Sequence, residues 1–296
     1  MKKLVVIAGP TASGKTSLSI KLALHYKSEI INADSRQFYK KLDIGTAKPN
    51  KDELEKVPHH FINSLNADEK YNVGIFEHEA LEKTYQLFKK HDILFITGGS
   101  GLFIDALCKG IDDLPETDPQ VRDELNKIYN SEGLETLQKI LLEKDPEYYY
   151  STDLNNPHRL IRALEVITIS GNKYSSLRKN VTKPRDFSTK KIGLIIDREE
   201  LYNRINYRVD TMIKNGLVKE VQSLLAYRNE NALQTVGYKE IFEFLDGKTT
   251  LEMAIEMIKQ NTRNYAKRQM TWFRRDKEIR WFDPQEVEQM QKYIEE

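Results

Sequence analysis

Short apolar runs alternate along the chain with longer stretches in which apolar positions recur at helical spacing. Residues 3–8, KLVVIA, are almost uniformly apolar and rich in β-branched side chains, the pattern of a strand buried on both faces. Similar runs at 29–34, 92–99, 190–197 and, more weakly, 279–283 predict four further strands. Because helical stretches separate these runs, we predict an α/β fold, a parallel sheet covered by helices.

The segment between the third and fourth predicted strands has a different pattern. Residues 112–185 contain no convincing strand, but DPQVRDELNKIYN, LETLQKILLEK and PHRLIRALEVITIS are all helical patterns. We therefore predict a mostly helical insertion domain at 112–185 and a core made of residues 1–111 and 186–296, with basic helices at its C-terminal end. The exit of the insertion at 177–191 is basic and fits either a solvated linker or an RNA-facing loop.

Composition narrows the class of protein. Of the 296 residues 39% are hydrophobic and 31% charged, which is typical of a globular protein, and the net charge of +1 means that nucleic-acid contacts would need local basic patches. The single cysteine, Cys108, excludes an internal disulfide and a multi-cysteine zinc site. The N-terminal apolar run is too short for a signal peptide, and no run approaches the roughly 20 residues of a membrane span. We expect a cytoplasmic protein with no membrane partner.

The most specific motif follows the first predicted strand. GPTASGKT at 9–16 has the complete G-x-x-x-x-G-K-[ST] spacing of a phosphate-binding loop, and the next residues place Leu18, Leu22 and His25 at helical spacing. In such a loop backbone N–H groups bind phosphate oxygens, Lys15 adds a positive charge and the Thr16 hydroxyl ligates Mg²⁺. The strand–loop–helix order therefore predicts a site for a phosphorylated ligand.

The ends of the second and third strands are unusual for a kinase. The third ends in ITGGSG, without the acidic residue that often holds the metal there, whereas the second is followed by Asp34, Ser35, Arg36 and Gln37. Ligands bind at the carboxyl ends of strands in open α/β sheets. A carboxylate there, followed by donors and acceptors suited to a base edge, favours a nucleophile that sits on a nucleobase.

A basic segment near the C-terminus indicates RNA. Residues 261–280 contain seven Lys or Arg against two Asp or Glu, a net charge of +5, interleaved with Tyr265, Trp272 and Phe273. Basic amphipathic helices are often only solvated faces. In a chain of net charge +1, this concentration of cations with aromatic platforms favours RNA binding.

Eight motifs together resemble one family. GPTASGKT, NADSRQFY, IGTAKP (44–49), GGSGLF (98–103), NPHRLIRALEV (156–166), RINYRVDTMIKNGLVKEV (204–221), TVGYKEI (235–241) and YAKRQMTWFR (265–274) stand in the order seen in tRNA dimethylallyltransferases. The resemblance implies a P-loop NTPase-like core and transfer of the dimethylallyl group of dimethylallyl diphosphate to N6 of the adenosine at tRNA position 37, 3′ of the anticodon. The phosphate loop would hold the diphosphate leaving group.

The resemblance also implies roles for individual residues. Asp34 would be the base, Arg208 would contact the diphosphate, and Ser100 would bond the adenine or the tRNA backbone; these three form the predicted catalytic group. The diphosphate would bind Gly9, Pro10, Thr11, Ala12, Ser13, Gly14, Lys15 and Thr16, and Mg²⁺ would bind Thr16. The predicted contacts to the tRNA anticodon stem-loop are Asp34, Ser35, Arg36, Gln37, Ser100, Arg122, His158, Arg159, Leu160, Ile161, Arg162, Gly237, Tyr238, Lys239, Lys267, Arg268, Gln269, Trp272 and Arg274.

Other interpretations of the same residues remain. Asp34 could be a turn carboxylate and Arg208 a surface arginine, and we interpret His25, His59, His60 and His78 as structural. A small-molecule or nucleotide kinase would explain the phosphate loop but not the DSRQ sequence or the basic aromatic segment. A non-catalytic RNA-binding module would leave the phosphate loop unused. We expect a monomer.

Overall fold

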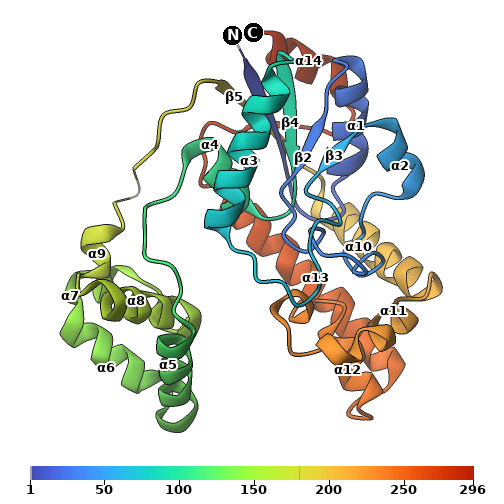
Figure 1. The fold of residues 1–296 in the computed structure, drawn as a ribbon. Coiled ribbons are helices and arrows are strands. Elements are labelled where there is room, and N and C mark those ends of the chain that lie inside the picture. Colours follow the sequence, from blue (N-terminus) through green and yellow to red (C-terminus); the bar gives the residue numbers. More distant parts are fainter. Residues whose placement is uncertain (1, 180) are drawn as a thin grey trace. The chain divides into compact units, whose positions relative to one another are not determined.

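The computed structural model describes residues 2–179 and 181–296 and contains a six-stranded sheet (Figure 1). The order in the sheet is β3-β2-β4-β1-β5-β6, and every neighbouring pair is parallel. The strands are β1 (Lys3–Ala8), β2 (Ile30–Asn32), β3 (His59–His60), β4 (Ile93–Thr97), β5 (Ser188–Leu194) and β6 (Arg280–Phe282). The predicted parallel sheet is confirmed. Strand β3 was not predicted, because two histidines do not make an apolar run.

Contacts divide the chain into two compact units, and most helices belong to the first, Met1–Cys108 with Pro184–Glu296. Its helices are α1 (Lys15–His25), α2 (Lys51–Lys56), α3 (Val73–Phe88), α4 (Gly101–Lys109), α10 (Arg198–Lys214), α11 (Leu217–Ser223), α12 (Lys239–Leu245), α13 (Leu251–Phe273) and α14 (Val287–Glu295). Within the described residues, no helix has the length and apolar character needed to cross a membrane.

The sheet of the first unit is covered on both faces. Successive side chains of a strand point to opposite faces. Leu4 and Val6 of β1 therefore pack into one apolar cluster, while Val5 and Ile7 pack into another with residues of α1 and α14. These four side chains are at most 1% exposed. The uniformly apolar run at 3–8 is thus explained by its place at the centre of a two-faced sheet.

The second unit, Lys109–Lys183, contains the helices α5 (Pro119–Glu132), α6 (Leu134–Lys144), α7 (Pro146–Ser151), α8 (Pro157–Ser170) and α9 (Tyr174–Leu177), with no strand among its described residues. Three of these helices begin with an Asp or Asn N-cap followed by proline, which satisfies free N–H groups and favours the first turn. Leucines such as Leu137, Leu141, Leu160 and Leu164 form a separate small core.

Parallel pairing brings three important loops together. The phosphate loop follows β1, Asp34 follows β2 and residues 98–100 follow β4, and these strands are neighbours in the order β2-β4-β1. Because parallel strands end at the same edge, the three loops meet there.

Candidate active site

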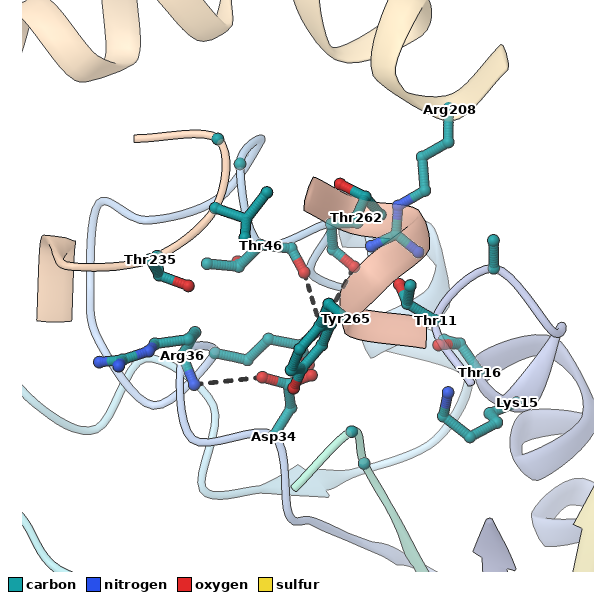
Figure 2. Close-up of a pocket in the computed structure, with 18 of the residues that line it drawn as sticks. Thr11, Lys15, Thr16, Asp34, Arg36, Thr46, Arg208, Thr235, Thr262 and Tyr265 are labelled. Atoms are coloured by element: carbon teal, nitrogen blue, oxygen red, sulfur yellow. Dashed lines mark hydrogen bonds between the residues drawn. The ribbon is translucent and has the colours of Figure 1, made fainter. Parts of the chain in front are cut away.

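A cavity of about 370 Å³ lies at this edge of the sheet (Figure 2). One wall is the phosphate loop and another is the segment from Asp34 to Gln37. The remaining wall residues come from β2 and β3, the loop at 45–49, the end of β4, helices α10 and α13, and the turn at 235–237. The residues that surround this cavity therefore come from most of the motifs identified in the sequence.

The phosphate loop has the backbone shape expected of an anion cradle. Gly9 and Gly14 have φ values of 152° and 88°, and α1 begins directly afterwards at Lys15. At Gly9 an added Cβ would stand 2.9 Å from Ser13 Oγ. That Oγ is buried and has no hydrogen-bond partner, so the loop offers a polar atom as well as a helix N-terminus to a bound anion.

Lys15, Arg36 and Arg208 line the cavity together with the carboxylate of Asp34. The ammonium of Lys15 donates to Pro10 O at 2.7 Å, and its desolvation lowers its pKa from 10.5 to about 7, against the opposing effect of Asp34 and with a further lowering by Arg208. Burial likewise lowers the pKa of Arg208, again opposed by Asp34. Arg208 extends from α10, whose Ile205 is fully buried. Asp34 opposes the desolvation of Lys15 and Arg208 only in part, and a bound anion would stabilise their charged forms further.

The loops after β2 and β4 are joined to each other beside Asp34. Ser35 N–H donates to Ser100 Oγ at 3.2 Å, and Ser100 Oγ donates to Ser35 Oγ at 3.1 Å. Gly98 packs against the backbone of residue 33, because an added Cβ would be 2.3 Å from its carbonyl carbon. The backbone N–H of Arg36 donates to Asp34 Oδ1 at 3.1 Å, which orients the carboxylate in the cavity wall. Ser100 thus positions the Asp34 loop.

Gln37 holds the neighbouring loop at 44–49. Its side chain is buried, and Nε2 donates to the carbonyls of Thr46 and Ala47 at 3.1 and 3.2 Å. The guanidinium of Arg36 donates to Asn231 O at 2.6 Å. The Gln37 amide nitrogen thus holds the 44–49 loop, and the predicted contact of Gln37 to tRNA stays a prediction.

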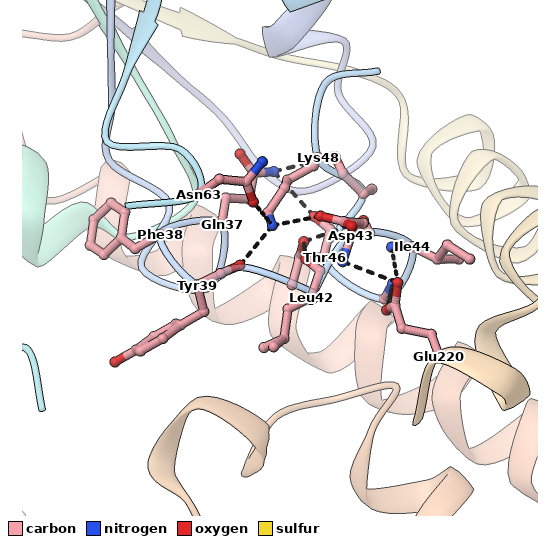
Figure 3. A network of polar contacts seen from close by, with 12 residues as sticks. Gln37, Phe38, Tyr39, Leu42, Asp43, Ile44, Thr46, Lys48, Asn63 and Glu220 are labelled. Carbon is pink, nitrogen blue, oxygen red and sulfur yellow. Dashed lines mark hydrogen bonds and ion pairs between the residues drawn. The ribbon is translucent and has the colours of Figure 1, made fainter. Parts of the chain in front are cut away.

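The same loop is held from the other side by Glu220 of α11 (Figure 3). Its carboxylate accepts the backbone N–H groups of residues 43–45 at 2.7–3.1 Å and the Tyr238 hydroxyl at 2.7 Å. Gly45 is required here, since an added Cβ would be 2.5 Å from the Tyr238 ring. Lys48 ties the loop further by donating to Tyr39 O at 2.7 Å. Glu220 lies in the motif at 204–221, but the motif did not indicate this role.

Several predicted tRNA contacts are buried in the structure. Tyr238 and Leu160 are fully buried, Ile161 is 3% exposed, Gly237 is buried, and Gln269 is 5% exposed. Gly237 and Gln269 nevertheless line the cavity, and the RNA contacts of all five residues stay predictions. Apolar residues in a helical repeat face a core, and the motif alone did not separate the two faces of each helix.

Other predicted tRNA contacts are exposed, and three have hydrogen-bond partners within the protein. Lys239, Lys267, Arg268, Arg274, His158 and Arg159 are exposed. Trp272 is partly buried and its Nε1 donates to Asp105 Oδ2 at 3.0 Å. In the second unit Arg122 and Arg162 both donate to the fully buried carboxylate of Glu165. These two guanidiniums are therefore fixed in place, each with part of its surface exposed.

The basic exit segment at 177–191 is only partly solvated, and its residue 180 lies outside the described residues. Arg185 donates to Glu77 and to the carbonyl of Leu107 at 2.7 and 3.0 Å. Lys191 is buried and donates to Asp276. At least these two cations make contacts within the first unit, so for them neither a solvated linker nor an RNA-facing loop describes the segment.

His59 was interpreted as structural, but it lines the cavity. Its Nδ1 lies 2.8 Å from Val57 O and donates to it, so the neutral ring has Nε2 as an acceptor. That Nε2 is buried without a partner, and burial lowers the pKa of the ring. The sequence could not reveal this, because β3 had no detectable strand pattern.

Comparisons with known proteins agree with the geometry. The model of a family described as IPP transferase matches residues 37–276. A tRNA dimethylallyltransferase of Christiangramia forsetii is 53% identical over 95% of this chain and 93% of the relative, and tRNA dimethylallyltransferase 1 of Bacteroides thetaiotaomicron is 49% identical over 99% and 96%. Among solved structures, a tRNA isopentenylpyrophosphate transferase of Bacillus halodurans aligns with a TM-score of 0.73 and 36% identity over 100% of this chain and 96% of that one. A eukaryotic dimethylallyltransferase acting on tRNA aligns with a TM-score of 0.82 and 29% identity over 99% and 76%.

Proposed function

Because this chain belongs to the IPP transferase family, we propose that it transfers the dimethylallyl group of dimethylallyl diphosphate to N6 of the adenosine at tRNA position 37, 3′ of the anticodon. The observation that carries the proposal is the single cavity in which these groups meet. It combines a phosphate loop with two desolvated cations and a carboxylate at the end of β2. The end of β4 offers Thr97, Gly98 and Gly99 instead of an acidic metal ligand, so the kinase alternative is not favoured.

The phosphate loop, Lys15 and Arg208 would hold the diphosphate and stabilise the charge that develops on it. As the N6–C1 bond forms, the C1–O bond breaks and its electron pair leaves with the diphosphate. Positive groups in a desolvated site stabilise such charge more strongly than they would in water. The lowered pKa of Lys15 fits this role, because an anion would restore the charged form.

Asp34 would accept the proton that the adenine amine loses. The amine is a weak nucleophile because its lone pair is delocalised into the ring, so the base must act as the carbon–nitrogen bond forms. Asp34 lines the cavity together with Lys15, and its loop is fixed by the hydrogen bonds between Ser35 and Ser100. Fixed placement of the base beside the reacting amine supplies much of the rate enhancement.

Magnesium fits the residues present if it enters with the diphosphate. Among the described residues no group of three or more His, Cys, Asp or Glu could hold a metal ion. Mg²⁺ is commonly bound by few protein ligands, substrate phosphates and water, and the Thr16 hydroxyl in the cavity wall suits that coordination. The ion would neutralise charge on the leaving group.

The exposed cations Lys267, Arg268 and Arg274 would bind the backbone of the tRNA anticodon stem-loop. In the second unit Arg159 is also exposed and would bind phosphate. The target base would leave its stack to reach the cavity, at a cost of a few kcal/mol. The monomeric state and the cytoplasmic location stay predictions.

Incubation with radiolabelled dimethylallyl diphosphate, Mg²⁺ and tRNA tests the proposal. We expect label in the RNA, and nuclease digestion should recover it as N6-modified adenosine. Label elsewhere would overturn the assignment of the acceptor. ATP consumption without RNA would support the kinase, and tRNA binding without transfer would support the RNA-binding module.

A further inference from the structure

Gln269 connects the phosphate loop to the loop after β4. Its Oε1 accepts the backbone N–H of Thr11 at 2.8 Å, and its Nε2 donates to Gly99 O at 2.8 Å. The side chain is 5% exposed, so these hydrogen bonds are made out of water, where loss of a partner is costly. A primary amide is the side-chain group that donates and accepts at opposite ends in this way.

The space around this amide is filled by catalytic elements. An added Cβ on Gly99 would be 2.6 Å from Gln269 Nε2 and 3.1 Å from Asp34 Oδ2. The Gln269 amide and the Asp34 carboxylate therefore both pack against Gly99. A shift of Gln269 would move both the beginning of the phosphate loop and the surface against which Asp34 packs.

Helix α13 contacts the phosphate loop at a second point. Ala266 packs in a small cluster with Ala12, the loop residue whose φ of 63° lies in the left-handed region. Thr262, Tyr265 and Gln269 of the same helix line the cavity. Lys267 and Arg268, on other faces of the helix, are exposed.

We propose that Gln269 is a positioning residue: it fixes the Thr11 peptide and the Gly99 carbonyl, and so sets the separation of the diphosphate cradle and Asp34. Its Thr11 hydrogen bond also removes that N–H from the cradle, which then begins at residue 12. Because the amide is carried by the helix whose exposed cations bind RNA, tRNA binding and the phosphate loop are coupled through it. This inference rests on the proposed function.

Gln269→Met tests the positioning role, since it keeps the length of the side chain and removes its donor and strong acceptor. We expect the dissociation constant of inorganic pyrophosphate, measured by calorimetry without RNA, to rise about tenfold, the loss typical of a buried hydrogen-bonded group. The single-turnover rate should fall further, because misplacement of reacting groups is costly. The dissociation constant of tRNA should stay within about twofold of wild type.

Arg268→Ala is the matched control one position earlier on the helix. It should weaken tRNA binding and lower its salt dependence while pyrophosphate affinity is unchanged. Gln269→Glu separates the two bonds of the amide, because an ionised carboxylate still accepts from Thr11 N–H but repels the Gly99 carbonyl. The transfer rate of Gln269→Glu should therefore fall more than its affinity for pyrophosphate.

Three results would overturn the inference. If Gln269→Met binds tRNA more weakly but pyrophosphate normally, Gln269 is an RNA contact. If the dissociation constants of both ligands equal those of wild type, Gln269 does not position the phosphate loop. If the variants do not fold, backbone amide hydrogen exchange is measured in the wild type with and without tRNA, in the absence of diphosphate. The bound tRNA should slow exchange in residues 9–16. Unchanged exchange there would refute the coupling. A wild-type protein that binds pyrophosphate but does not modify tRNA would refute only the proposed function.

Discussion

Lys15 should make diphosphate binding strongly dependent on pH. Its pKa is lowered to about 7 by desolvation, with Arg208 lowering it further and Asp34 opposing the change. The protonated form attracts the anion, so affinity is full below pH 7 and falls as the pH rises above it. If the ammonium stays protonated in the complex, the dissociation constant should rise about tenfold at pH 8 and about a hundredfold at pH 9, because each pH unit above the pKa removes tenfold of the charged form.

Calorimetry with inorganic pyrophosphate between pH 6 and pH 9, at constant ionic strength and without RNA, measures this effect. Pyrophosphate itself gains negative charge over this range, which strengthens binding and opposes the expected trend. Lys15→Met provides the correction, because it has no group to titrate and retains the other contacts. The ratio of the two dissociation constants, variant over wild type, should fall as the pH rises.

Proton uptake gives a second measurement from the same experiment. At pH 8 a group with a pKa of about 7 is mostly neutral, so wild type should take up about 0.9 more protons per bound anion than Lys15→Met. Titrations in buffers of different ionisation enthalpy report this number. Parallel pH profiles and equal proton uptake in the two proteins would show that Lys15 is fully charged before binding, and would refute the desolvation argument.

The other predictions concern the base, the RNA-binding cations and the 44–49 loop that Glu220 holds. Asp34→Asn should lower the single-turnover rate by about 10²–10⁴-fold, the usual contribution of a general base, and a rate within about threefold of wild type would exclude that role. Replacing Arg268 and Arg274 by alanine should weaken binding of all tRNAs alike and reduce the salt slope of affinity by up to about 2. A changed preference between tRNAs would contradict this. Glu220→Gln should lower the free energy of unfolding in urea by about 1.5–3 kcal/mol, since the carboxylate accepts three backbone N–H groups and the Tyr238 hydroxyl. Tyr238→Phe, which removes one of those bonds, should cost about 1 kcal/mol, and an equal loss in both variants would be inconsistent with the backbone contacts.

Local patterns were sufficient for the core strands and the phosphate loop. A strand buried on both faces is a continuous apolar run, so it can be identified without knowing its neighbouring strands. The phosphate-loop motif specifies both the turn and the start of the helix that follows. Arg208 was assigned to the diphosphate only by the family resemblance, because its helical spacing alone favoured a surface arginine; in the structure it lines the cavity. The order of parallel strands then places Asp34 at the cavity, since carboxyl ends share one edge.

The roles of Gln269, Glu220 and Gln37 were decided by tertiary structure. Gln269 and Thr11 are 258 positions apart, and Glu220 and Gly45 are 175 apart. A sequence period reports which face of a helix is apolar, but it does not report which distant backbone N–H lies opposite a polar side chain on that face. Each of these polar groups could have met water, RNA or another part of the chain. The packing of α11 and α13 against the loops decided it for Glu220 and Gln269, and the fold of the 44–49 loop decided it for Gln37, because a buried amide or carboxylate must find its partners inside the protein.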